Sequence, residues 1–432
     1  MQIFHFADNS HPLQLGMLGG KGYSLAWMTQ SGLPVPPGFV LTVRFFDPWV
    51  DKLKQTSQWR NFLSASSEKL TDRSMSLQAA GMDLSFTEEQ EGQLKEALSR
   101  YQKFQFFAVR SSSPEEDLEG ASFAGGYETI LGVNRENMKN AVRRAFCSCL
   151  HPRVFIYKKE RGFALEDFRI AVVVQAQVDS DVSGVGFSVN PLNNDYDEAV
   201  FNSNWGLGET VVSGLVSPDQ IIVDKVSRKI INFQIGKKET SFWLNHDGGT
   251  EDRPDPRHKE RTLTDEQVLG LTDQLSQIEA LHGRPMDIEW ALSGGKIFLL
   301  QARPITTHWP LPAILITPPH ARRRLYLDIS LVIQAMVEPI SVLGTDILRG
   351  WLKAFFKEAL GAERLVDVEN GLVCAEGGRL YLNLSNAWHL FGSFGKLADK
   401  LQRMDALSSE ILKQVDETAY KSLSAPKPIE RI

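Results

Sequence analysis

Four polar side chains near residue 300 have the types and spacing to bind a metal ion and phosphate. They lie on two predicted strands, Met286-Asp-Ile-Glu-Trp290 and Ile297-Phe-Leu-Leu-Gln-Ala-Arg303. Because side chains alternate between the faces of a strand, Asp287 and Glu289 share one face of the first strand. By the same rule, Gln301 and Arg303 share one face of the second strand. The two strands are close enough in the sequence to form a hairpin.

The loop of this hairpin decides which side chains meet. A three-residue loop, 294–296, sets a register in which polar residues face polar ones. The predicted pairs are Glu289–Gln301, Asp287–Arg303, Ile288–Ala302 and Trp290–Leu300. A two-residue loop would instead pair Glu289 with Leu300, so we predict the three-residue loop.

The polar face of the hairpin suits a magnesium site. Mg²⁺ prefers a carboxylate together with substrate phosphates and water, and Glu289 and Gln301 offer oxygen ligands. Arg303 beside them could neutralise charge on a transferring phosphoryl group. The alternative is a ladder of salt bridges facing solvent.

A second segment, Gly19-Gly-Lys-Gly22, carries a lysine that could bind phosphate. It opens a predicted helix that ends at Gly32. It is not a Walker A motif, because residue 15 is Leu and residue 22 is Gly. The glycines still allow a ligand to approach the backbone, and Lys21 would be a point charge for a phosphate. A surface turn explains the segment equally well.

A third segment combines an arginine with a glycine-rich loop. Arg110 is expected to be held where the chain leaves the buried strand 106–109, and the loop 119–129 has small residues whose N–H groups could wrap a polyphosphate. A flexible surface loop is the alternative, but Phe123 and Tyr127 favour an anchored flap.

From the length of 432 residues we expect about three domains. With 47 basic and 53 acidic residues the formal charge is -6, which argues against a nucleic-acid partner. No apolar run approaches the ~18 residues that span a bilayer, and the first residues lack the pattern of a signal peptide. We therefore expect a soluble cytoplasmic protein without a membrane partner.

The order of predicted elements outlines the architecture. Strands are expected from about 168 to 235, followed by a helix and the hairpin. The proline-rich segment 307–324 is typical of a linker. The expected elements beyond it are a strand at 325–328, a helix at 345–360, a hairpin at 379–384 and a helix near 396–422. The apolar stripe of that last helix is expected to stay partly uncovered.

Taken in order, these segments resemble the N-terminal ATP-binding domain of the pyruvate phosphate dikinase and phosphoenolpyruvate synthase family. The motifs that carry the resemblance are Gly-Gly-Lys-Gly (19–22), Pro-Val-Pro-Pro-Gly-Phe (34–39), Val-Arg-Ser-Ser-Ser (109–113) with Ser-Phe-Ala-Gly (122–125), Ser-Gly-Val-Gly-Phe-Ser (183–188), Trp-Gly-Leu-Gly-Glu (205–209), Asp-Ile-Glu-Trp (287–290) and Leu-Gln-Ala-Arg-Pro (300–304). The resemblance implies an α+β or α/β fold, namely a two-lobed nucleotide-binding domain of ATP-grasp type at 1–306. The segment 325–432 is then the start of a substrate-binding domain, with a layout similar to that of rifampicin phosphotransferases.

The resemblance also implies a set of site residues for ATP and Mg²⁺. It makes Lys21, Arg110 and Arg303 contacts of the phosphates and gives both arginines a catalytic role. Gly125 and Thr129 would be parts of the loop that covers the phosphates, and Gln175 would lie at the adenine hinge. Glu209 would be a neighbour of the ribose or the metal, and Glu289 and Gln301 would be ligands of Mg²⁺ and ATP.

In the family that this chain resembles, a histidine carries phosphate from ATP to a second acceptor and leaves AMP and phosphate. That histidine lies in a Gly-Gly-x-x-Ser-His type motif, and none of the nine histidines here has this context. We therefore expect the ATP-binding portion of a dikinase-type phosphotransferase, served by a phosphohistidine carrier from a missing C-terminal part or another chain. Its small-molecule acceptor would be pyruvate, a rifamycin-like compound or another hydroxyl compound. Two alternatives remain, a catalytically silent nucleotide-binding protein and an ATP-grasp carboxylate ligase, the latter disfavoured by the motifs at 183–188 and 205–209.

Overall fold

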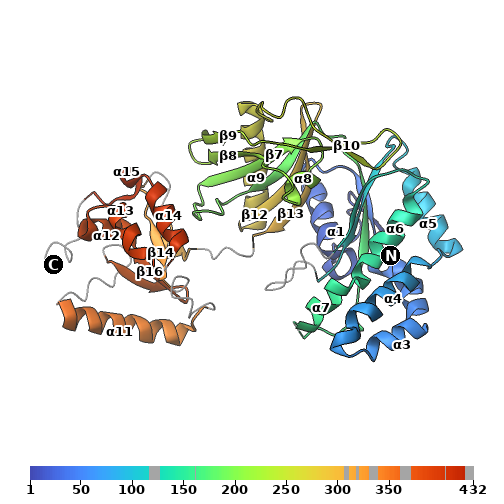
Figure 1. Ribbon diagram of the computed structural model, residues 1–432, viewed down its shortest axis with the longest axis horizontal. Coiled ribbons are helices and arrows are strands. Elements are labelled where there is room, and N and C mark those ends of the chain that lie inside the picture. The colour runs from blue at the N-terminus through green and yellow to red at the C-terminus, as the bar shows by residue number, and fades with distance from the viewer. Residues whose placement is uncertain are drawn as a thin grey trace. The chain divides into compact units, whose positions relative to one another are not determined.

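The computed structural model describes residues 1–115, 127–160, 162–305, 311–317, 321–329, 339–360, 371–403 and 405–423. The chain divides into two compact units, Met1–His308 and Trp309–Ile432. The first unit contains two large sheets (Figure 1). We call residues 1–176, which carry the first sheet, the first lobe, and residues 182–304, which carry the second, the second lobe.

The first lobe has a five-stranded antiparallel sheet in the order β1-β2-β5-β3-β4. Its strands are β1 (Ile3–His5), β2 (Gly38–Leu41), β3 (Phe107–Ser112), β4 (Thr129–Val133) and β5 (Ala171–Ala176). Its helices are α1 (Leu15–Gln30), α2 (Asp47–Lys54), α3 (Ser57–Leu63), α4 (Leu70–Met82), α5 (Glu88–Ser99), α6 (Met138–Cys147) and α7 (Pro152–Glu160). Every residue of the central strand β5 is buried, as its apolar sequence requires.

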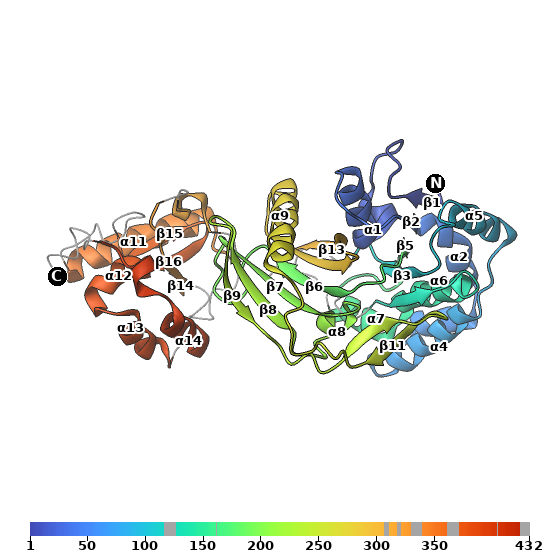
Figure 2. The same cartoon turned by 90° about the horizontal axis from the view of Figure 1, so that it is seen from above.

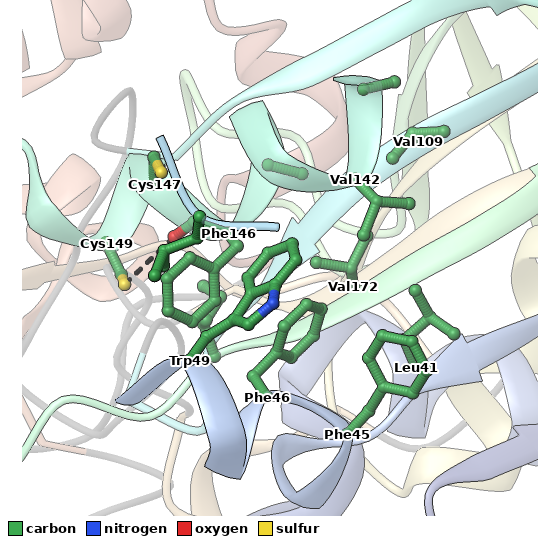
Figure 3. Close-up of a cluster of buried hydrophobic side chains, with 14 of the residues drawn as sticks. Leu41, Phe45, Phe46, Trp49, Val109, Val142, Phe146, Cys147, Cys149 and Val172 are labelled. Atoms are coloured by element: carbon green, nitrogen blue, oxygen red, sulfur yellow. Dashed lines mark hydrogen bonds between the residues drawn. The ribbon is translucent and has the colours of Figure 1, made fainter. Parts of the chain in front are cut away.

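An aromatic cluster fills the core between this sheet and its helices (Figure 3). The Trp49 ring packs edge-on against Phe146, with ring centroids 5.1 Å apart, and Phe46 lies beside both. Cys147 and Cys149 lie at the margin of this cluster, and burial raises the pKa of Cys147 to about 12 and that of Cys149 well above its usual value. Both thiols therefore act as small apolar groups at neutral pH.

The second lobe has a six-stranded antiparallel sheet in the order β13-β12-β6-β7-β8-β9. Its strands are β6 (Val182–Phe187), β7 (Glu198–Trp205), β8 (Asp219–Asp224), β9 (Lys229–Gln234), β12 (Met286–Ser293) and β13 (Lys296–Pro304). The short helix α8 (Glu209–Val212) follows β7, and the hairpin of β10 (Ser241–Leu244) and β11 (Thr250–Arg253) follows the edge strand β9. Helix α9 (Asp265–His282) starts at a capping box formed by Thr264 and Gln267, and its apolar face is buried.

A fully buried ion pair joins two parts of this lobe. Lys238 contacts the Asp219 carboxylate, and neither side chain is exposed. The same carboxylate accepts hydrogen bonds from the backbone N–H groups of Gly236 and Thr262. Paired and hydrogen-bonded in this way, the two charges are tolerated in the interior.

Helix α1 connects the two lobes. Figures 1 and 2 show β13 lying beside α1, and the Ser24 hydroxyl donates to the Ala302 carbonyl at 2.9 Å. The Leu299 N–H donates to the Pro34 carbonyl, also at 2.9 Å. Leu25 and Met28 of α1 share a core with β12 and β13. These contacts fix the polar hairpin against the first lobe.

The second unit has a three-stranded antiparallel sheet in the order β14-β16-β15, with several helices. Its elements are β14 (Tyr326–Asp328), α11 (Val342–Leu360), β15 (Val373–Glu376), β16 (Arg379–Asn383), α12 (Leu384–Phe391), α13 (Phe394–Leu401), α14 (Ala406–Gln414) and α15 (Glu417–Tyr420). Its small cores bury Leu352 of α11 against β15 and Phe394 of α13 against α14.

The single helix expected near 396–422 is wrong. Three short helices replace it, because Asp405 and Asp416 each cap the helix that follows by accepting a backbone N–H. On the predicted apolar stripe, Leu397 and Leu401 are buried, whereas Leu407 is 64% exposed. None of the helices in the described part of the chain is both long and apolar enough to cross a membrane.

Candidate functional site

The polar hairpin formed by β12 and β13 has most of the predicted register. The Cα pairs include Glu289 with Gln301 and Asp287 with Arg303, as expected. The three-residue loop and the Trp290–Leu300 pair are wrong, because Trp290 lies opposite Leu299.

The error has a physical cause in the two glycines of the turn. Gly294 and Gly295 have φ of 54° and 75°, so they form the tight two-residue turn that requires left-handed residues. The register then shifts between Glu289 and Trp290, and Leu300 becomes the extra residue of a β-bulge. The bulge restores the polar pairing that a two-residue loop would otherwise have lost.

Arg110 lies in the middle of β3, paired with Val173 of β5 on one side and Thr129 of β4 on the other. The expectation that it leaves the strand is wrong, because β3 continues through Ser112. A side chain inside a strand that is paired on both sides is held firmly, and the Arg110 side chain is 8% exposed.

The Arg110 guanidinium joins the two lobes. Its Nη1 donates to the Leu300 carbonyl at 2.7 Å, at the position of the bulge. Its Nη2 lies 2.9 Å from Glu289 Oε2 and 2.5 Å from Gln301 Oε1. One cation therefore holds both oxygens that the sequence suggested as metal ligands.

The turn that carries Lys21 is bound to the end of the same strand. Helix α1 is kinked at Gly19, with φ 69° and ψ 170°. After the kink, the Gly20 N–H donates to the Ser113 carbonyl and the Gly22 N–H donates to Ser112 Oγ, both at 3.0 Å. Ser112 Oγ in turn donates to the Leu18 carbonyl at 2.9 Å. Lys21 thus lies in the first turn after the kink, where Ser113 and Ser112 accept the N–H groups of Gly20 and Gly22.

The remaining predicted residues are more scattered. Thr129 is exposed and lies opposite Arg110, so the two side chains share a face of the sheet. Gln175 is buried inside β5 and donates through Nε2 to the Pro36 carbonyl at 3.2 Å. Arg303 lies 3.4 Å from Asp287 and is about one-third exposed, at 32%. Gly125 lies outside the described residues.

Glu209 is the first residue of α8. Although the residue lies at the surface, neighbouring protein atoms desolvate its carboxyl and raise its pKa. The structure thus brings Arg110, Glu289 and Gln301 into direct contact and ties Lys21 to the same strand. Gln175 and Arg303 hydrogen-bond to other partners, and Glu209 lies on a separate element.

The sequence patterns did not predict two features of the site. One is Ser112, which shares a face of β3 with Arg110 and satisfies the kinked helix; their i, i+2 spacing was the available signal. The other is a contact between the lobes at the tip of the β10–β11 hairpin. There the Gly249 N–H donates to the Gly132 carbonyl of β4 at 2.8 Å.

The donor set fits a magnesium ion that also binds phosphate. Glu289 and Gln301 offer one carboxylate and one amide oxygen side by side. In the described part of the chain, no group of three or more His, Cys, Asp or Glu residues could hold a metal ion. A Mg²⁺ ion bound here would complete its six ligands with phosphate and water oxygens, as it usually does.

Comparison with known proteins identifies the family of the first unit. Residues 15–311 match the family model described as pyruvate phosphate dikinase, AMP/ATP-binding domain. A probable phosphoenolpyruvate synthase of Methanocaldococcus jannaschii is 36% identical over 319 residues, covering 71% of this chain and 27% of that protein. The phosphoenolpyruvate synthase of Pyrococcus furiosus is 34% identical, over 67% of this chain and 42% of that protein.

The rifampicin phosphotransferase of Bacillus subtilis is 30% identical over 85% of this chain and 43% of that protein. This chain therefore spans less than half the length of these relatives. Among solved structures, D-alanine-D-alanine ligase of Helicobacter pylori matches 67% of this chain and 54% of the ligase chain, with 8% sequence identity. The TM-score is 0.26, which is too low to bear on the fold. The match over residues 15–311 shows that the chain belongs to the family defined by the pyruvate phosphate dikinase AMP/ATP-binding domain.

Proposed function

We propose that this chain is the ATP- and Mg²⁺-binding portion of a dikinase-type phosphotransferase. The observation that carries the proposal is the contact of Arg110 with Glu289 and Gln301, because it gathers a phosphate-binding cation and two metal-ligating oxygens at one point. The family match covers the same residues. The reaction would convert ATP and water to AMP and phosphate, while the other phosphoryl group of ATP passes to an acceptor.

Each side chain has a role that suits its position. Arg110 would donate two N–H groups to phosphate oxygens, in the fork geometry that guanidinium offers. Lys21 would add a point charge from the start of its helix, where the helix dipole also favours an anion. Arg303 would contact the outer phosphates as a second guanidinium. These cations offset the charge that develops on the transferring group.

Four further residues would complete the nucleotide site. Gln175 marks the part of β5 that leads towards the second lobe, where adenine would bind. Thr129 faces the same side as Arg110 and, with Gly125, would belong to the phosphate-covering loop. Glu209 would lie near the ribose or the metal. Mg²⁺, bound by Glu289 and Gln301, would stabilise negative charge on the phosphates.

The second half of the reaction needs groups from elsewhere. We propose that a phosphohistidine carrier, from another part of a longer polypeptide or from another chain, receives the phosphoryl group and passes it on. The named relatives suggest two acceptor classes, since one group is called phosphoenolpyruvate synthase and another rifampicin phosphotransferase. The acceptor is therefore pyruvate, a rifamycin-like compound or another small molecule with a hydroxyl group.

Calorimetric titration of the chain with ATP in the presence of Mg²⁺ tests the nucleotide site. We expect saturable binding that Glu289→Ala abolishes. Glu96→Ala is the matched control, because the Glu96 side chain is 75% exposed and lies on α5. Equal ATP affinity in both variants would refute the site. Formation of AMP after addition of an isolated phosphohistidine domain would then distinguish a phosphotransferase from a catalytically silent nucleotide-binding protein.

A further inference from the structure

The Arg110 guanidinium contacts the two side-chain oxygens that the metal ion would bind. Its Nη2 contacts Glu289 Oε2 at 2.9 Å and Gln301 Oε1 at 2.5 Å. Magnesium would bind the same oxygens at about 2.0–2.1 Å. The Glu289 side chain is 16% exposed and the Arg110 side chain 8%, so the ion pair is largely shielded from water.

Two cations cannot share these oxygens without additional negative charge. Glu289 brings one negative charge, Arg110 brings one positive charge, and the amide of Gln301 is neutral. A divalent ion entering beside Arg110 would be repelled at short range, in surroundings where water screens little. The phosphates of a nucleotide carry the missing negative charge.

The Arg110 side chain also has an unused hydrogen-bond donor. Its Nε is buried and has no hydrogen-bond partner among the described residues. A buried donor without an acceptor is unfavourable and uncommon. A phosphate oxygen would satisfy Nε, and Nη1 could stay on the Leu300 carbonyl, to which it donates at 2.7 Å.

We propose that Arg110 serves as a resident counter-cation that keeps Glu289 and Gln301 closed to metal ions until a nucleotide arrives. The nucleotide phosphates then attract Arg110 away from Glu289, and both oxygens become available. The site would consequently bind the metal together with a polyphosphate rather than alone. This inference rests on the proposed function, since it concerns the same nucleotide site.

Binding of Mn²⁺ to the full chain without nucleotide tests this idea, with free Mn²⁺ measured by electron paramagnetic resonance. We expect weak binding by the wild type and binding at least about ten-fold tighter by Arg110→Gln. The gain should vanish in Arg110→Gln/Glu289→Gln, because the carboxylate is then lost. Arg110→Lys, which keeps a cation in the same place, should resemble the wild type.

Arg303→Gln is the matched control. It removes one positive charge from the same face of the hairpin, but Arg303 pairs with Asp287. The inference is refuted if Arg110→Gln binds Mn²⁺ no tighter than the wild type. It is also refuted if Arg303→Gln tightens Mn²⁺ binding equally, because the loss of any positive charge near the hairpin would then explain the effect. Thermal unfolding confirms that each variant is folded.

A separate titration of the wild type with ATP and Mn²⁺ keeps the two proposals distinct. If ATP binds but Arg110→Gln does not tighten Mn²⁺ binding, only the counter-cation inference fails. If the wild type does not bind ATP, the proposed function fails, and so does nucleotide-controlled release of Arg110, whatever the metal titration shows.

Discussion

Replacing Gly19 by alanine tests whether the kink in α1 is required for the site. Gly19 has φ 69° and ψ 170°, a region of backbone conformation that is nearly restricted to glycine. A Cβ atom there would lie 2.1 Å from the Ser112 carbonyl oxygen and 2.3 Å from Ser112 Oγ. Ser112 is fully buried in β3, so its backbone cannot easily retreat.

The expected cost combines two terms. A non-glycine residue in this conformation costs about 1–3 kcal/mol, and forced overlap in a packed interior costs about 1–3 kcal/mol more. We therefore expect Gly19→Ala to lower the free energy of unfolding of the first unit by about 2–6 kcal/mol. ATP affinity should fall as well, because relief of the overlap would move the turn that carries Lys21.

The matched control lies three residues away. Gly16 is exposed in the first part of α1, and a Cβ atom there meets nothing within 4 Å. Gly16→Ala should raise stability by about 0.5–1 kcal/mol, the usual gain in a helix. Differential scanning calorimetry, which can resolve the two units, measures both variants. If Gly19→Ala is as stable as Gly16→Ala, the kink in α1 does not require glycine at residue 19.

Three further perturbations test other parts of the structure. Asp219→Ala should cost about 3–5 kcal/mol, because the Lys238 charge is then buried without a counter-charge. Asp273→Ala, which removes an exposed ion pair with Arg228, should cost less than about 1 kcal/mol in the same urea titration. The Cys149 thiol should resist a thiol reagent at pH 8 in the native protein and react in guanidinium. Because burial raises the pKa of this thiol above 9.0, the unfolded chain loses that proton first, and stability should fall as pH rises beyond about 9. Gly132→Ala would place a Cβ atom 2.5 Å from the backbone of the hairpin tip, so hydrogen exchange in β10 and β11 should accelerate; unchanged exchange would contradict the contact.

Much of the fold followed from local sequence patterns. The strands expected between about 168 and 235 are β5 to β9, and the helix expected between them and the hairpin is α9, because their apolar residues have strand and helix periodicity. The polar pairing of the hairpin was also predicted, since only that register separates polar from apolar side chains.

The remaining features depend on contacts distant in the sequence or on small backbone irregularities. The bulge at Leu300 compensates for a tight turn, and local patterns did not distinguish it from a longer loop. Arg110 stays within β3 because β5 and β4 pair with it on both sides. The caps at Asp405 and Asp416 divide a stretch whose apolar spacing alone suggests one helix.

We propose that ATP and a divalent ion bind where Arg110 contacts Glu289 and Gln301. A crystal structure of the chain with Mn²⁺ and a non-hydrolysable ATP analogue tests it most directly, because the anomalous scattering of manganese locates the ion. We expect one manganese peak within coordination distance of Glu289 and Gln301, with Arg110 on the phosphates. A peak at any other site, with Arg110 still bound to Glu289, would contradict the proposed nucleotide and metal site.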